Sequence, residues 1–239
     1  MTKAPRLSSR NVSIEISLRQ EKIAGKISAG KIFDLAKKFF EVIKLTAKTE
    51  MLNGEWYNAN FDEELLRERI FVKDLCFDFN NTKLCDAEKR RELLKKILPN
   101  VDVTTIEILS PFIVDYGYNI FIGEGSFFNH NIYLMDCAKI QFGKKCFVGP
   151  NCGFYTAIHP FDVERRNAGF EIAKPISIGN NVWIGADVSI LPGVTIGDNC
   201  VIGAKSLVSK DIPSNVLAFG NPCKVREQGL GIRKLRIKN

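Results

Sequence analysis

The second half of the chain repeats apolar residues at a spacing of six. One series contains Ile178, Ile184, Ile190, Ile196, Ile202 and Val208, and a second series between them contains Val182, Val188 and Val194. Neither the 3.6-residue period of a helix nor the two-residue period of a strand gives this spacing. A chain that makes a short strand, turns a corner and repeats does give it, and three such sides close a triangular coil of about 18 residues.

Glycine directly follows an apolar residue at seven positions along the same region. The pairs are Ile122-Gly123, Phe142-Gly143, Val148-Gly149, Ile178-Gly179, Ile184-Gly185, Ile196-Gly197 and Ile202-Gly203. We interpret these glycines as corners that need a positive φ, which glycine adopts without strain. Coils of this kind stack at the inter-strand spacing of about 4.8 Å. The sequence therefore predicts a mainly β protein, with a parallel β-helix of about five triangular coils over residues 104–223.

An interruption separates two stretches of the repeat. Ile122, Phe128, Leu134 and Ile140 keep the spacing of six before it, as do Phe142, Val148 and Phe154. Residues 155–174 break the apolar pattern, but Ile178 resumes it in phase. We interpret residues 155–174 as a loop extruded from one corner, and long ordered loops on rigid scaffolds tend to carry function.

Two segments ahead of the coils show helical spacing of apolar residues. They span Asp62–Val72 and Asp86–Leu98, and each begins with an aspartate suited to cap a helix N-terminus. Stacked coils leave an exposed end that needs covering. We expect residues 49–103 to form an α-helical cap.

The two ends of the chain carry its positive charge. Residues 1–48 form a basic extension, in which 31–48 has the pattern of a basic amphipathic helix, and residues 224–239 form a basic tail. The extension fits a membrane-surface, partner-binding or targeting helix, or an appendage without such a role. No basic stripe with interleaved aromatics crosses the middle, which argues against nucleic acid. No apolar run reaches the ~20 residues of a membrane helix and no secretory signal is evident, so we expect a cytoplasmic protein.

Four motifs resemble the maltose and galactoside O-acetyltransferases, a family that includes the acetyltransferase of nodulation factors. They are TEMLNGEWYNAN (49–60), YGYNIFIGEGSFFNHN (116–131), YTAIHPFDVERRNAG (155–169) and the stretch from PISIGNNVWIG to GNPCKV (175–225). The resemblance implies a left-handed β-helix, acetyl-CoA as the acetyl donor, and a homotrimer with active sites between subunits. The extruded loop would then reach the neighbouring subunit.

Acetyl transfer to an alcohol needs a base for the hydroxyl proton, and histidine titrates near the working pH. The chain has two histidines, His130 and His159. His159 lies in the extruded loop and matches the catalytic histidine of the family, whereas His130 is expected at the surface. Two histidines without suitably spaced cysteines argue against the zinc-dependent carbonic anhydrases that share this coil, and we expect no metal.

Five residues are candidates for binding the acceptor. By resemblance Asn129 and Asp115 match polar sugar contacts, and Asp136 orients groups nearby or caps a coil corner. Phe127 replaces a tyrosine found in some relatives. Asn60 stands, with Asn58 and Asp62, where the family often has an acidic substrate residue.

Seven residues are candidates for binding the donor. The resemblance implies that they contact successive parts of acetyl-CoA, from the thioester along the pantetheine arm to the nucleotide phosphates. They are Trp183, Ala186, Ala204, Ser209, Lys210, Lys224 and Arg226. Ala186 has no hydroxyl, so donation to the oxyanion at this position would come from the backbone. Lys224 and Arg226 supply cationic donors for phosphate.

The sequence thus predicts an acetyl-CoA-dependent sugar O-acetyltransferase that works by direct transfer, with His159 as the general base. Two alternatives remain at this stage. The acceptor could be an antibiotic, an amino sugar or serine, or the chain could be a trimeric β-helix that binds ligands without catalysis.

Overall fold

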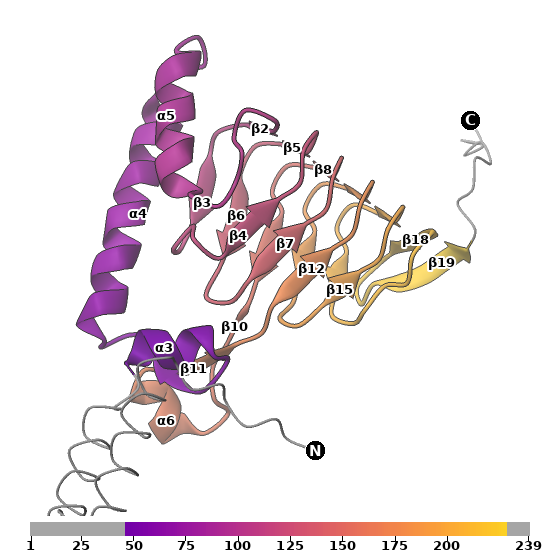
Figure 1. The fold of residues 1–239 in the computed structure, drawn as a ribbon. Coiled ribbons are helices and arrows are strands. Elements are labelled where there is room, and N and C mark those ends of the chain that lie inside the picture. The colour runs from indigo at the N-terminus through magenta and orange to yellow at the C-terminus, as the bar shows by residue number, and fades with distance from the viewer. Residues whose placement is uncertain (1–45, 229–239) are drawn as a thin grey trace, which may run out of the picture. The chain divides into compact units, whose positions relative to one another are not determined.

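The computed structural model describes residues 46–228, and within them three stacked parallel sheets wrap around one apolar core (Figure 1). Consecutive strands belong to consecutive sheets, so the chain climbs as a β-solenoid of about six turns. The predicted mainly β coil with an N-terminal helical cap is confirmed. The predicted helix at 31–48 lies largely outside the described residues, and so does the end of the predicted basic tail.

We number the three sheets as faces in the order in which the chain visits them. Face 1 contains β2 (Glu107–Ile108), β5 (Phe127–Phe128), β8 (Phe147–Val148), β13 (Trp183–Ile184), β16 (Val201–Ile202), β18 (Val216–Phe219) and β19 (Lys224–Gln228). Face 2 contains β3 (Phe112–Val114), β6 (Ile132–Met135), β9 (Gly153–Tyr155), β14 (Ser189–Ile190) and β17 (Leu207–Val208). Face 3 contains β4 (Ile120–Ile122), β7 (Ile140–Phe142), β12 (Ile176–Ile178) and β15 (Thr195–Ile196).

The hexad residues stack as the sequence predicts in the second half of the solenoid. Ile178 pairs with Ile196 on face 3, and Ile184 pairs with Ile202 on face 1. All four are at most 3% exposed. Each turn therefore adds one buried aliphatic side chain per face, and burying such a side chain contributes roughly 1.5–3 kcal/mol.

The first turns depart from the predicted 18-residue coil. Ile120 pairs with Ile140 and Ile122 with Phe142, so these turns advance by twenty residues. The extra length lies partly in the corner after β6, where the buried carboxylate of Asp136 accepts three backbone N–H groups. Ile122 and Ile140 are consequently not stacked on each other, contrary to the expected series.

The glycines at the corners have a different cause from the one expected. None of the seven has a positive φ; that conformation falls instead on residues such as Asn131, Asn181 and Asn199. A Cβ at Gly149 would lie 2.8 Å from the backbone nitrogen of Ala186, and one at Gly143 would lie 2.7 Å from the backbone of Gly179. Glycine is required because the stacked turns approach too closely for a side chain.

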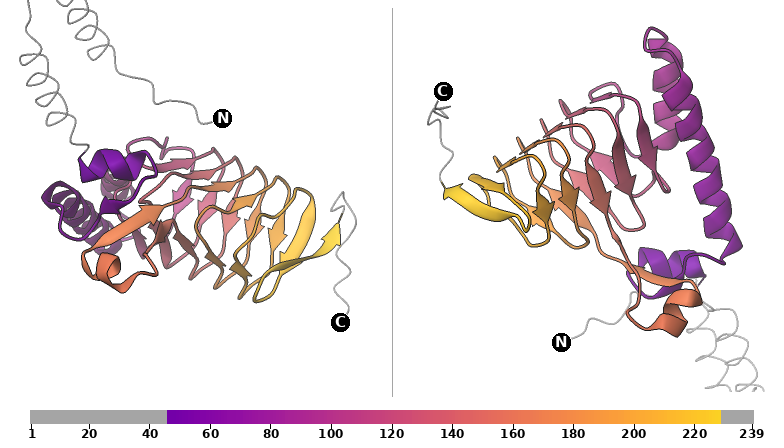
Figure 2. Two further views of the ribbon diagram at one scale, coloured as in Figure 1. Left: turned by 90° about the horizontal axis from the view of Figure 1, so that it is seen from below. Right: turned by 180° about the vertical axis from the view of Figure 1, so that it is seen from behind.

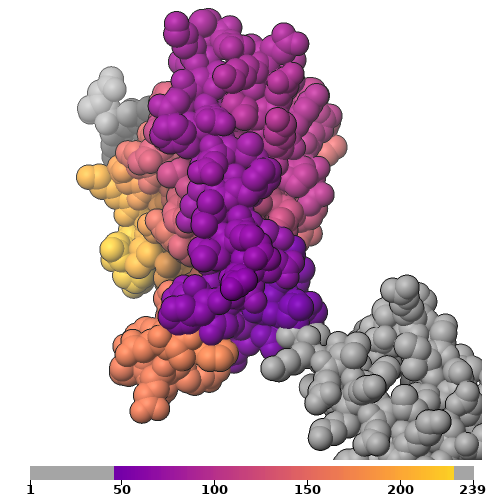
Figure 3. Space-filling view, turned by 90° about the vertical axis from the view of Figure 1, so that its left-hand side faces the viewer, coloured from indigo at the N-terminus to yellow at the C-terminus, as the bar shows by residue number. Residues whose placement is uncertain are grey.

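Between residue 46 and the first coil the chain forms three helices, α3 (Ala47–Leu52), α4 (Glu63–Asn81) and α5 (Ala87–Ile97). Asp62 and Asp86 cap α4 and α5 by accepting from the N–H groups of Leu65 and Lys89, which confirms the predicted helix starts. Figure 3 shows the long α4 lying over the N-terminal end of the coils. Apolar residues of both helices, including Phe79 and Ile97, join the core cluster of the first turn.

Two segments interrupt or end the regular coil. The extruded loop leaves face 2 after β9 and returns at β12, and it contains β10 (Ala157–Ile158), the short helix α6 (Val163–Asn167) and β11 (Phe170–Ala173). β11 pairs with β10 and with β1 (Tyr57–Asn58) of the cap region. At the other end, Lys224–Gln228 pairs antiparallel with β18, so the predicted tail begins as a strand. Both views in Figure 2 show the loop standing away from the coils.

Candidate active site

Two edges border face 2, and they hold most of the predicted site residues. Edge 1–2 consists of residues that follow the strands of face 1, and edge 2–3 of residues that follow the strands of face 2. Along edge 1–2 the backbone N–H of Asn129 donates to Val148, that of Gly149 to Ile184, and that of Gly185 to Ile202, at 2.8–2.9 Å. These bonds align the edge as a straight column across successive turns.

Five of the seven predicted donor residues lie on edge 1–2 or beside it on face 1. Ala186 and Ala204 follow glycines of the column, and the indole of Trp183 points outward from β13 with 53% of its surface exposed. Lys224 and Arg226 lie on β19 at the C-terminal end of face 1. The five residues thus extend over the second half of one side of the solenoid.

Ser209 and Lys210 are not brought together with these five. Both follow β17 and lie exposed at edge 2–3, on the opposite side of face 2. The expectation that they continue along the same edge as Ala204 is wrong for a single chain, because each further strand moves the chain to the next face.

His159 directly follows β10 in the extruded loop and is exposed. The loop leaves the solenoid at edge 2–3, so His159 belongs to the side opposite Asn129 and Ala186. Beyond it, Asp162 caps α6 by accepting from Arg165, and Arg166 donates to the carbonyl of Pro160 at 3.1 Å. These bonds give the segment after the histidine a defined shape.

His130 has a different setting. It is exposed on edge 1–2, and its Nδ1 forms a hydrogen bond with the backbone carbonyl of Ser110 in the preceding turn. Asn129 beside it is partly exposed, and its side-chain oxygen accepts from the His130 N–H. The structure thus puts His130 at the surface of the coil, as expected.

The side chain of Asp136 is enclosed by the coil. It is 0% exposed, and its carboxylate accepts from the backbone N–H groups of Asp115, Tyr116 and Asn119. Burial raises the pKa of Asp136 to about 7, and the neighbouring Asp115 adds to the rise, whereas the backbone donors oppose it. Its role is to shape the coil corner, which corrects its assignment to the acceptor site.

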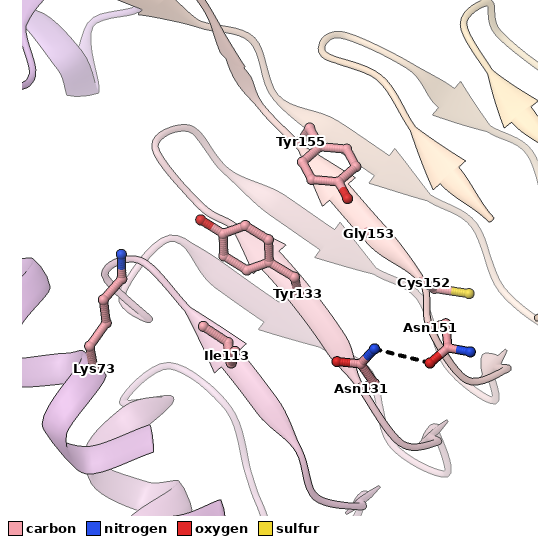
Figure 4. Close-up of a pocket in the computed structure, with 8 residues that line it drawn as sticks. All are labelled: Lys73, Ile113, Asn131, Tyr133, Asn151, Cys152, Gly153 and Tyr155. Carbon is pink, nitrogen blue, oxygen red and sulfur yellow. Dashed lines mark hydrogen bonds between the residues drawn. The ribbon is translucent and has the colours of Figure 1, made fainter. Parts of the chain in front are cut away.

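Asp115 is nearly as buried, at 6% exposure. Its carboxylate accepts from the hydroxyl of Tyr133 at 2.9 Å and lies 3.3 Å from the ammonium of Lys73 on α4. Lys73 and Tyr133 help to line a hollow of about 520 Å³ on face 2, together with Ile113, Asn131, Asn151, Cys152, Gly153 and Tyr155 (Figure 4). The ring of Tyr155 lies over Gly153, where a Cβ would come within 2.6 Å of it.

Of the three polar candidates after the GEWY motif, two are engaged within the chain. Asn58 donates to the carbonyl of Ala168 and accepts from Phe61, and Asp62 caps α4. Asn60 is exposed and lies against Gly169 of the extruded loop. Asn60 is therefore the candidate whose side chain faces solvent beside the loop that carries His159.

One exposed aromatic residue was missed by the sequence reasoning. Phe147 pairs in register with Phe127 on one side and with Trp183 on the other, and it is 53% exposed. The three rings form an outward row on face 1 beside edge 1–2. The signal was available, because each outward position immediately precedes a hexad residue.

The described residues contain neither a metal-binding cluster nor a membrane-spanning helix. Residues 46–228 contain no group of three or more His, Cys, Asp or Glu side chains arranged to hold a metal ion. None of the helices in this part of the chain is both long and apolar enough to cross a membrane.

Comparison with known proteins identifies the family. Residues 50–102 match the maltose acetyltransferase hexapeptide capping motif, and residues 175–210 match the bacterial transferase hexapeptide of six repeats. A protein of Staphylococcus aureus (strain MRSA252), provisionally named an acetyltransferase, is 50% identical over 181 residues, which cover 76% of this chain and 90% of that protein.

Solved structures similar to this chain come from the same family. A maltose O-acetyltransferase from Clostridium difficile 630 aligns with a TM-score of 0.74 and 45% identity, over 77% of this chain and 97% of that one. A galactoside acetyltransferase in complex with coenzyme A aligns with a TM-score of 0.70 and 37% identity, over 77% and 92%. Related structures hold coenzyme A or acetyl-coenzyme A. The chain belongs to the maltose and galactoside O-acetyltransferase family of hexapeptide-repeat acetyltransferases.

Proposed function

We propose that this protein transfers the acetyl group of acetyl-CoA to a hydroxyl of a sugar or glycoside, with His159 as the general base. The observation that carries the proposal is the exposed imidazole of His159 on a shaped loop at the border of the coil. The relatives support the reaction class, since they include a maltose O-acetyltransferase and a galactoside acetyltransferase that binds coenzyme A.

The reaction proceeds in one complex that contains both substrates. His159 removes the proton from the acceptor hydroxyl as its oxygen attacks the thioester carbonyl, and the C–O bond forms. The tetrahedral intermediate then collapses, the C–S bond breaks, and the imidazolium returns the proton to the departing thiolate. Backbone N–H groups near Ala186 stabilise the oxyanion, because that residue has no hydroxyl to offer.

We propose that each site is completed by a second copy of the chain. His159 and the column from Asn129 to Ala204 lie on opposite edges of face 2, so one chain does not bring its own histidine to its own column. Edge 2–3 of one copy set against edge 1–2 of the next gives a head-to-tail contact, which closes into a ring when repeated. A homotrimer with face 2 toward its axis satisfies this geometry, and it brings Ser209 and Lys210 close to a neighbour's donor edge.

Within such a shared site, the donor and acceptor approach from different directions. Trp183, Ala186 and Ala204 follow the pantetheine arm, and the cationic groups of Lys224 and Arg226 meet the nucleotide phosphates. Asn129, Phe127 and Asn60 border the acceptor near the imidazole. Asp115 acts indirectly, because its carboxylate is already bound to Lys73 and Tyr133.

A thiol-release assay tests the proposal. Purified full-length protein is mixed with acetyl-CoA and a panel of glycosides, amino sugars, serine and hydroxylated antibiotics, and free coenzyme A thiol is followed over time. The proposal predicts turnover with at least one glycoside above the rate without acceptor. Turnover confined to the other acceptors would refute the sugar assignment, and coenzyme A binding without any turnover would refute catalysis.

A further inference from the structure

The extruded loop is held by a short segment of the cap region, Tyr57 to Ala59, which we call the loop clamp. Tyr57 and Asn58 pair with Glu171 and Phe170 of β11. The Asn58 side chain donates to the carbonyl of Ala168, and the Ala59 N–H donates to the carbonyl of Gly169 at 2.9 Å. All three clamp residues therefore bond to the returning half of the loop.

The centre of this contact is a buried hydrogen bond. The hydroxyl of Tyr57 donates to the carboxylate of Glu171, with the two residues 0% and 7% exposed. Burial raises the pKa of Tyr57 well above its usual range, so its hydroxyl keeps the proton that it donates. Carboxylates are seldom buried to this degree without a partner, and removing that partner costs more than an exposed bond would.

The strand pairing connects this bond to the histidine. β11 pairs with β10 through Ala173 opposite Ala157 and Ile172 opposite Ile158. The next position along each strand is Glu171 on β11 and His159 on the chain leaving β10. In this antiparallel register Glu171 lies opposite His159 on one side and pairs with Tyr57 of the clamp on the other.

The clamp is in turn fixed to the rest of the cap. Arg69 of α4 donates to the carbonyl of Ala59 and to the hydroxyl of Tyr116, both at 2.6 Å. Tyr57, Tyr116 and Ala173 belong to a second buried cluster, separate from the core of the coils. These contacts fix the position of the loop relative to α4 as well as to the coil corner from which the loop emerges.

We propose that Tyr57 and Glu171 are positioning residues for His159, and that their buried hydrogen bond holds the loop where its imidazole can serve the reaction. The inference rests on the proposed function. It gives the cap region a part in catalysis besides covering the first turn.

Three substitutions test the bond through kinetics. Tyr57→Phe and Glu171→Leu remove it, whereas Glu171→Gln keeps an oxygen that accepts from Tyr57. We expect the first two to lower kcat by about tenfold or more and to leave KM for acetyl-CoA within about twofold, because misplacing a catalytic group slows the chemical step. Glu171→Gln should retain most of the activity. An unchanged kcat in Tyr57→Phe, or equal damage by Glu171→Gln and Glu171→Leu, would overturn the proposal.

Amide hydrogen exchange provides a readout that does not need turnover. Tyr57→Phe should accelerate exchange in residues 156–174 while the coil strands keep their protection. Tyr118→Phe is the matched control, since it also removes a tyrosine-to-glutamate bond, which joins Tyr118 of the first coil to Glu68 of α4 at 3.0 Å. Equal loop exchange in the two variants would contradict the clamp. If the wild type releases no thiol with any acceptor, the proposed function fails and the exchange comparison still decides the clamp.

Discussion

The coils and the extruded loop are built on different principles. In the coils, every turn repeats the same contacts, so Ile184 pairs with Ile202 above and Val148 below, and all three are buried. The loop repeats nothing: its helix α6 has no buried residue, its strands β10 and β11 pair with each other, and β11 also pairs with the clamp strand β1. The regular part thus buries most of the core, whereas the irregular part carries His159, the base of the proposed reaction.

The largest effect should come from the loop. His159→Ala is expected to lower the rate of thiol release by about 10²–10⁴-fold, because it removes the proton acceptor, while the melting temperature stays unchanged. His130→Ala is the matched control, since that imidazole bonds only to the Ser110 carbonyl among the described residues. Equal loss in both variants would contradict the separate roles of the two histidines.

A substitution in the coil core should lower stability far more than a substitution in the loop. Ile184 is 0% exposed, so Ile184→Ala leaves a cavity and should lower the free energy of unfolding by about 2–5 kcal/mol. Val163→Ala in α6 removes methyl groups from a residue that is 55% exposed. It should change the free energy of unfolding by about 0.5 kcal/mol or less. Chemical denaturation of both variants measures the difference. Similar losses would mean that loop and coil share one stabilising core.

A smaller effect is expected at the end of the donor edge. Arg226→Ala should raise KM for acetyl-CoA by about tenfold with kcat nearly unchanged, because a charge-assisted bond to phosphate contributes to binding alone. Arg67→Ala removes the same charge from α4, where the Arg67 side chain is 70% exposed, and serves as the control. Initial rates at varied acetyl-CoA check this. If both variants raise KM equally, net charge rather than a local contact is responsible.

The last prediction concerns the pH dependence of stability and lies in the coil. Because burial raises the pKa of Asp136 to about 7, the folded protein binds one more proton than the unfolded chain between about pH 4 and pH 7. The free energy of unfolding should therefore fall by on the order of 1 kcal/mol or more as pH rises through this range. Above pH 7 it should level off. Asp136→Asn should flatten the profile measured by denaturation at pH 5 and pH 8. An unchanged profile would contradict the assignment.

Sequence reasoning reached the parts of the molecule that repeat or that have a local signal. The hexads located the core positions, and Asp62 and Asp86 marked the two helix starts because capping depends only on nearby residues. It misjudged the glycines, since the need at Gly149 comes from a turn that is distant in sequence. It also missed Lys224–Gln228 as a strand, because that segment pairs antiparallel outside the repeat.

The candidate site was predictable residue by residue but not as an arrangement. His159 and Asn129 could be singled out by motif, yet only the order of the faces shows that they occupy opposite edges. The clamp had no signal in the sequence, because Tyr57 and Glu171 are 114 residues apart.

The most direct test of the account asks whether one site needs two chains. His159→Ala lacks the base, and Ala186→Trp fills the donor edge, so each variant alone should release no thiol above background. Assembled together from equal amounts, they should regain activity at about a quarter of the sites, those where an intact loop meets an intact edge on the neighbour. Recovery in the mixed assembly is the predicted result. Mixed assemblies as inactive as the separate variants would contradict the shared site.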